Sequence, residues 1–147
     1  MRRFKFKLRA VLKMREFKEK KIEIELGKIL ARIHQVKNEI MNLKKDIAEA
    51  YDSQERVMKQ PLKAKTLEFY PYYIRSKHDH ILAREKTLET LDVEYQNKIR
   101  EMQLARGEVK TIDNMKDRQF QEYRREYHKK EQQNIEEWIV MKGTEQE

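Results

Sequence analysis

Apolar residues recur along the first part of the chain in alternating steps of four and three positions. Counted from Leu8, eleven of the thirteen positions reached by these steps are apolar, and the spacing does not slip before Ala50. The thirteen positions are Leu8, Leu12, Arg15, Glu19, Ile22, Leu26, Ile29, Ile33, Val36, Ile40, Leu43, Ile47 and Ala50. A mean period of about 3.5 residues is typical of a helix in a left-handed coiled coil. The pattern predicts a first helix over about residues 6–58.

The helical pattern then stops at a segment that contains two prolines, Pro61 and Pro71. Because a proline inside a helix costs about 3 kcal/mol, the segment from about residue 59 to 72 is predicted to form a tip between two helices. A second helix is predicted from about residue 73 to 141, with a looser and more aromatic seam. Its seam positions are Ile74, Ile81, Leu88, Leu91, Tyr95, Ile99, Met102, Ala105, Val109, Ile112, Met115, Phe120, Tyr123 and Tyr127.

Two long heptad stretches separated by a break indicate that the chain folds back on itself. The predicted fold is all-α, a single domain over residues 1–147 made of two long helices in an antiparallel coiled-coil hairpin. With the tip centred near residue 66, Leu8 is expected opposite about residue 125. Everything past about residue 130 then overhangs the first helix. The overhang contains a small apolar stripe of Ile135, Trp138, Ile139 and Met141.

Composition supports a thin seam and places the charge at one end. Charged residues make up 41% of the chain, against about 25% in an average soluble domain. Such a chain fills a narrow seam between helices but not a thick core. The net charge is +8, and residues 1–21 account for all of it with ten basic and two acidic side chains. The beginning of the chain is therefore predicted to be an electrostatic contact surface.

The sequence offers no group of residues suited to catalysis or to holding a cofactor. It has no cysteine, which excludes disulfides, thiol nucleophiles and cysteine-based zinc sites. It also lacks a glycine-rich phosphate loop and a nucleophile motif. His78 and His80 point about 200° apart on a helix, so they do not chelate one metal ion. We predict a protein without catalytic residues, cofactor or metal, which acts by binding other proteins.

The basic first 21 residues leave several interpretations open. Apolar side chains are interleaved with the cations there: Phe4, Phe6, Leu8, Val11, Leu12 and Phe17. This pattern fits an amphipathic helix on an anionic membrane, a helix that docks into an acidic protein groove, or nucleic-acid binding. Basic regions that read DNA fork from a parallel dimer, which a hairpin does not provide, so specific nucleic-acid binding is disfavoured.

Two other features each have a structural and a functional interpretation. Arg15 and Glu19 interrupt the apolar stripe, either as a polar layer that fixes the register or because this stretch faces a partner. Aromatic residues cluster near the tip: Phe69, Tyr70, Tyr72 and Tyr73, with Tyr51 nearby on the first helix. They either cap the coiled-coil core or form a surface for a partner protein.

Three stretches of the chain carry motifs in a distinctive order. The first reads F-x-F-x-L-x-x-V-L-x-x-R-E from Phe4, and the second is Tyr70-Pro-Tyr-Tyr-Ile74 with a further isoleucine at Ile81. The third runs from Tyr123 to Glu137 and ends in Glu-Gln-Gln-Asn-Ile-Glu-Glu. Together they resemble the FliJ family of flagellar export proteins, whose closing run has Lys where Gln133 stands and Asp where Glu136 stands.

The resemblance implies a non-enzymatic part of the bacterial flagellar type III export apparatus, with a role in motility. Such proteins resemble the central stalk of rotary ATPases and are cytoplasmic, held peripherally at the membrane through partners. The implied partners are the hexameric export ATPase, the export-gate membrane protein and export chaperones. The resemblance assigns ATPase binding to the open end: Phe4, Leu8, Leu12, Arg15, Tyr127, Glu131 and Gln132. It leaves the tip side for the gate: Tyr51, Tyr70, Tyr73 and Ile74.

Other functions also fit a chain of this kind. A related injectisome stalk, or a generic structural coiled coil, would share the heptad pattern and the hairpin. A basic coil that binds nucleic acid or an anionic membrane would share the charged beginning, and its binding would fall steeply with salt.

Overall fold

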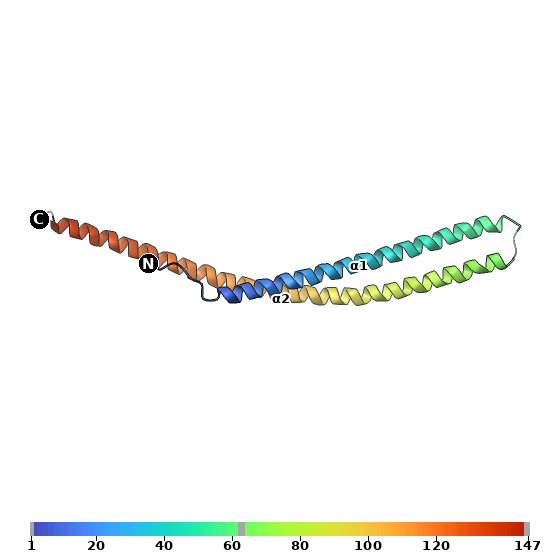
Figure 1. Ribbon diagram of the computed structural model, residues 1–147, viewed down its shortest axis with the longest axis horizontal. Coiled ribbons are helices and arrows are strands. Elements are labelled where there is room, and N and C mark those ends of the chain that lie inside the picture. Colours follow the sequence, from blue (N-terminus) through green and yellow to red (C-terminus); the bar gives the residue numbers. More distant parts are fainter. Residues whose placement is uncertain (1, 62–63, 146–147) are drawn as a thin grey trace. The chain divides into compact units, whose positions relative to one another are not determined.

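The computed structural model describes residues 2–61 and 64–145, with the backbone alone at residues 64 and 65. These residues form two long helices, α1 (Arg9–Met58) and α2 (Ala64–Glu145), and the described chain contains no strand. The helices run beside each other in opposite directions (Figure 1). The all-α, two-helix hairpin predicted from the heptad pattern is confirmed.

The apolar stripe of α1 packs against α2, as its spacing predicted. All thirteen stripe positions are buried or half-buried. Val36 is completely buried, and α1 residues such as Ile40 share a buried cluster with α2 residues such as Ile81. Burying one large aliphatic side chain stabilises a fold by about 1.5–3 kcal/mol. This repeated seam explains how so polar a chain sustains two long helices.

Helix α2 begins earlier than the sequence pattern predicted. It starts at Ala64 rather than near residue 73, so Pro71 lies inside the helix and the predicted tip over 59–72 is too long. Proline has no N–H to donate to the carbonyl of Leu67, which weakens the helix at this point. The helix persists because Tyr70 and Tyr73 pack against the core and Ile74 is buried in it. Contacts with α1 therefore outweigh the local cost of the proline.

Contacts between the helices divide the chain into two compact units, and one of them is residues 22–101. Its core is a cluster of buried apolar residues: Val36, Ile40, Ile47, Ala50, Ile74, Ile81 and Leu91. Cross-helix ion pairs flank this core: Glu25–Lys98 at 2.6 Å, Glu39–Arg84 at 2.6 Å and Asp46–Lys77 at 3.3 Å. The two residue numbers in each pair add up to 123, so the register is constant along this unit.

The other unit combines residues 1–21 with residues 102–147, described over 2–21 and 102–145. Its buried residues are Phe6, Leu12, Met102 and Ala105. Helix α1 begins at Arg9 instead of near residue 6, after a turn in which the Arg9 N–H donates to the Phe6 carbonyl at 3.2 Å. The preceding residues are not helical, and they pack along α2 through Phe4.

The register within this unit corrects the predicted alignment of the helices. Arg15 lies against Glu108, and the Phe4 ring lies 5.3 Å from the Phe120 ring. Leu8 was expected to lie opposite residue 125. The two observed pairs lie on either side of Leu8 in the sequence, and their α2 partners come about ten residues earlier than that alignment requires. The cause is the early start of α2 at Ala64, which leaves fewer residues between the two helices than the sequence pattern predicted.

Candidate protein-binding ends

The tip-side residues singled out in the sequence divide into supporting and exposed side chains. Ile74 is buried in the core of the 22–101 unit, and Tyr70 and Tyr73 pack against that core. The Tyr70 and Ser53 hydroxyls share a hydrogen bond of 2.8 Å across the hairpin. Tyr51 is different, because 53% of its surface is exposed. Of these four residues, Tyr51 is the best placed for direct contact with a partner.

Tyr51 borders a shallow groove on the side of the hairpin. The groove has a volume of about 370 Å³ and is lined by Tyr51, Gln54, Pro71, Ile74, Arg75 and His78. A second groove of about 490 Å³ shares Pro71 and Arg75 with it and adds Glu68 and Tyr72. Exposed tyrosines beside an arginine are the composition favoured in the centre of protein interfaces.

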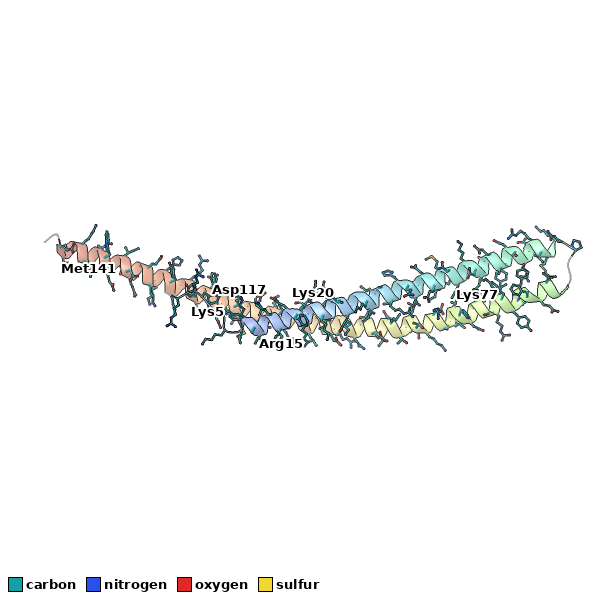
Figure 2. All side chains as sticks on the ribbon, viewed as in Figure 1. Lys5, Arg15, Lys20, Lys77, Asp117 and Met141 are labelled. Atoms are coloured by element: carbon teal, nitrogen blue, oxygen red, sulfur yellow. The ribbon has the colours of Figure 1, made fainter. Side chains whose placement is uncertain are left out.

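The aromatic cluster near the tip divides into rings that pack on the core and rings that are exposed. Tyr73 is half-buried, with the Phe69 ring 5.6 Å away and the Lys77 ammonium 5.1 Å above it. Lys77, labelled in Figure 2, also pairs with Asp46 and so fixes this side of the ring. Phe69 and Tyr72 remain exposed. Two of the rings thus complete the core, and the other two are available to a partner.

At the open end, four of the seven predicted contact residues pack within their own unit. Leu12 is buried, and Phe4 and Leu8 are half-buried. The Phe4 ring contacts Tyr123, with ring centroids 5.6 Å apart. Arg15 donates to the Glu108 carboxylate at 2.7 Å. These four side chains pack within the open end, so only a small part of their surface is left for a partner.

The other three predicted residues lie on α2 beyond the stretch that packs against α1, beside a groove that the N-terminal residues form with Tyr123 and Lys130. The Tyr127 ring stacks on Tyr123 at 6.3 Å, so Tyr123 joins Phe4 and Tyr127 in one aromatic group. Tyr123 also donates to the Arg2 carbonyl at 2.9 Å. Glu131 and Gln132 are both exposed. The structure therefore brings Phe4 and Tyr127 together and places Leu12 and Arg15 deeper in the coil.

Tyr127 and Glu131 are coupled electrostatically. A hydrogen bond to the Glu131 carboxylate raises the pKa of the Tyr127 phenol above its usual 10.0, and the negative charge of Glu131 adds to the effect. The two residues are four positions apart, the spacing at which helix side chains meet. One turn further on, the Gln132 amide donates to Glu136 at 3.4 Å. This stretch presents aligned polar groups on an uncovered helix.

Every residue from Arg124 to Glu145 is exposed. This segment, here called the α2 extension, is about 33 Å long at 1.5 Å per residue, and Met141 near its end is labelled in Figure 2. Its exposed apolar residues are Ile135, Trp138, Ile139, Val140 and Met141. The Lys142 ammonium lies 4.1 Å above the Trp138 ring. Apolar side chains left uncovered on a helix are typical of a surface that binds another protein.

Some residues that matter here were not found from the sequence. Glu108 was not identified as the partner of Arg15, because the predicted register placed residue 118 opposite Arg15. Ser53 was missed as the partner of Tyr70 for the same reason. Met14 was also missed, although it is exposed over 71% of its surface. The signal was its position three residues before Phe17, which the sequence had already placed among the apolar residues of the basic segment.

Two kinds of site are absent from the described residues. Within residues 2–61 and 64–145, no group of three or more His, Cys, Asp or Glu side chains is arranged to hold a metal ion. In the same ranges no helix has a stretch long and apolar enough to cross a membrane.

The structure defines a two-helix coiled-coil protein with exposed aromatic and apolar side chains in each of its two compact units. The sequence profile of the Flagellar FliJ protein family matches residues 4–146, and the chain belongs to this family. Membership associates the chain with the flagellar protein export apparatus as a structural component. Comparisons with curated proteins and with solved structures gave no match.

Proposed function

We propose that this protein is a non-enzymatic stalk of flagellar type III export that binds the hexameric export ATPase and promotes its assembly. The observation that carries the proposal is the α2 extension, an uncovered helix of residues 124–145 at the open end of a coiled-coil hairpin. A stalk that enters a ring needs a stiff coil and a narrow exposed end. Family membership favours the flagellar apparatus over an injectisome.

The ATPase contact is assigned to the exposed side chains of the open end. Tyr127, Glu131 and Gln132 are reachable directly, since no part of α1 covers this stretch of α2. Phe4 supports Tyr127 through the aromatic group around Tyr123, and Leu8 is half-buried in the same unit. Leu12 and Arg15 hold the two chain segments together beneath that group. An exposed tyrosine with neighbouring polar groups is the kind of side chain that contributes strongly to protein interfaces.

The export-gate contact is assigned to the tip side, through Tyr51 and the grooves on either side of Pro71. Tyr70, Tyr73 and Ile74 contribute by fixing the shape of this surface, because they belong to or pack against the core. The proposed coupling of the ATPase to the gate rests on one contact in each of the two compact units. The proposal includes an escort role for export chaperones and a cytoplasmic location, peripheral at the membrane through these partners.

Two matched double variants test the assignment. Each end carries an exposed tyrosine and a glutamate four residues later: Tyr127 with Glu131, and Tyr51 with Glu55. The variants Tyr127→Ala/Glu131→Lys and Tyr51→Ala/Glu55→Lys therefore make the same chemical change at opposite ends. Each purified chain is added to the cognate export ATPase, and hexamer assembly and ATP hydrolysis are measured. Binding to the cytoplasmic domain of the gate protein is measured in parallel.

The wild-type chain is expected to increase both assembly and hydrolysis. The open-end variant should lose this effect and keep gate binding, and the tip-side variant should do the reverse. Each tyrosine at the centre of an interface contributes roughly 2 kcal/mol, so the losses should be about thirtyfold in affinity. If the wild-type chain changes neither assembly nor hydrolysis, the stalk proposal is wrong.

A further inference from the structure

The first turns of α1 carry a further exposed apolar surface, on the side of the helix that faces away from the open-end residues Leu12 and Arg15. Met14 and Phe17 are exposed over 71% and 75% of their surfaces, and Val11 is partly exposed beside them. They lie at intervals of three residues, which places them on neighbouring parts of one helix face. Exposed phenylalanine and methionine side chains of this size have no role in a coiled-coil seam.

This face points away from α2. At about 100° per residue, Met14, Phe17 and Lys21 fall within an arc of about 60°. The seam residues of the same turns, Leu12 and Glu19, lie roughly on the opposite side, where Leu12 is buried and Glu19 is half-buried. The helix is thus held along one side by its packing and leaves the other side uncovered.

Positive charge surrounds the uncovered face. Lys13 and Lys18 lie at its two edges, and Lys21 lies within it. Lys18 is 3.6 Å from Glu108 and keeps more than half of its side chain exposed. Just before the helix, Arg2, Arg3 and Lys5 line a groove of about 490 Å³ together with Phe4, Tyr123 and Lys130. The excess charge of the whole chain, +8, resides in residues 1–21.

We propose that the face of Met14, Phe17 and the flanking lysines docks directly on an anionic membrane surface. A helix of this type lies in the plane of the bilayer interface, with its apolar side chains inserted among the headgroups and its lysines beside the lipid phosphates. Each cation near such a surface strengthens binding about fivefold, the equivalent of roughly 1 kcal/mol. This contact is additional to membrane association through protein partners.

Charge and shape favour a bilayer over an acidic protein groove. The cations are spread over two differently shaped segments, the non-helical residues 2–8 and the helix after Arg9. A protein groove must match both shapes at once, whereas a lipid surface adapts to either. Phe17 and Met14 also project from the helix, as insertion between lipid headgroups requires.

Co-sedimentation of the full chain with vesicles tests the proposal. The vesicles contain phosphatidylglycerol and phosphatidylcholine in equal parts, and phosphatidylcholine alone serves as the comparison. The chain is expected to sediment with the anionic vesicles only, and binding should weaken as salt is raised. Absence of binding to the anionic vesicles at low salt would overturn the proposal.

Two pairs of matched variants separate insertion from simple charge attraction. Met14→Ser/Phe17→Ser should weaken vesicle binding at least tenfold, and Met41→Ser/Leu82→Ser, which changes exposed apolar residues elsewhere, should not. Lys13→Glu/Lys21→Glu should abolish binding, and Lys37→Glu/Lys45→Glu, which makes the same change in net charge, should retain most of it. Helix content by circular dichroism confirms that each variant is folded.

A fluorescence readout reports the insertion itself. The chain has a single tryptophan, so Trp138→Phe combined with Phe17→Trp gives a chain whose only reporter is on the proposed face. Its emission should shift to shorter wavelength when anionic vesicles are added. Two results would mean that the surface attracts any polyanion and does not insert. One is an unchanged emission spectrum although the chain sediments with the vesicles. The other is full vesicle binding by Met14→Ser/Phe17→Ser. Equal competition by duplex DNA in that case would identify nonspecific charge as the cause and overturn the proposal.

Discussion

The Arg15 guanidinium on α1 and the Glu108 carboxylate on α2 lie 2.7 Å apart. Four residues along α1, Glu19 lies 3.6 Å from Arg106 with the charges reversed. The two polar residues that interrupt the apolar stripe therefore pair with α2 in opposite senses. A slip of the helices by one turn would separate both pairs or bring like charges together. These pairs favour the interpretation of Arg15 and Glu19 as a polar layer that contributes to the register, over the interpretation that this stretch faces a partner.

This relationship predicts measurable coupling between Arg15 and Glu108. Both side chains are more than a third exposed, so a double-mutant cycle with Arg15→Ala and Glu108→Ala should give roughly 0.3–1 kcal/mol of interaction in the free energy of unfolding. The coupling should shrink in high salt. The reversed pair Arg15→Glu/Glu108→Arg should recover part of the stability lost in each single reversal. Strictly additive effects would show that the pair does not couple.

The seam predicts that two isoleucines of α1 differ strongly in their contribution to stability. Ile40→Ala removes a buried side chain from the core cluster and should lower the free energy of unfolding by about 2–5 kcal/mol. Ile24→Ala makes the same chemical change at a position with 52% of its surface exposed and should change it by less than about 1 kcal/mol. Urea unfolding followed by circular dichroism measures both. Similar losses at the two positions would contradict the seam assignment.

Two glycines within the helices offer stabilising substitutions. A methyl group added at Gly27 or Gly107 meets no atom within 4 Å, and glycine costs a helix about 1 kcal/mol relative to alanine. Gly27→Ala and Gly107→Ala should each raise the unfolding free energy by up to about that amount. Gly143→Ala, in the uncovered α2 extension, is the control, because its helix segment packs against nothing and should not change global unfolding. Destabilisation at Gly27 or Gly107 would reveal a contact that the alanine obstructs.

Lys98 predicts a loss of stability in alkaline solution. Hydrogen bonds to Glu25 and then to Glu101 raise the pKa of the Lys98 ammonium above its usual 10.5. Because the pKa of Lys98 is raised in the folded state, the contribution of Lys98 to the free energy of unfolding is fully present below about pH 10.5. It is lost as the pH rises through the pKa of Lys98 in the folded protein. The unfolding free energy of the wild type should therefore fall there more steeply than that of Lys98→Met. Lys28→Met, which changes an exposed lysine of α1, should retain the wild-type slope.

The two-helix fold could be predicted from the sequence because it depends on a repeated signal. Eleven apolar positions in an unbroken heptad register outweigh local irregularities such as Gly27. The burial of Val36, Ile40 and Ile47 follows from this repeat alone. The aromatic character of the tip was visible in the same way, since Phe69 and Tyr72 fall outside any seam that could cover them.

The tip and the register could not be predicted, because they depend on how two distant segments meet. Pro71 is a helix breaker by its local chemistry, and only its surroundings keep it inside α2. That single difference moved every cross-helix pair by about ten residues. Which open-end side chains are exposed also depends on register, so Tyr127 and Leu12 looked equivalent in the sequence but differ in the structure.

The register of the hairpin can be measured directly, and both proposed binding ends depend on it. The chain has no cysteine, so Arg15→Cys/Glu108→Cys provides the only two thiols for a short bismaleimide crosslinker. Arg15→Cys/Arg118→Cys is the matched alternative for a hairpin shifted by ten residues. At low protein concentration, we expect efficient crosslinking within one chain for the first pair and little for the second. Crosslinking of the second pair, or crosslinks formed only between two chains, would contradict the hairpin from which the stalk is built.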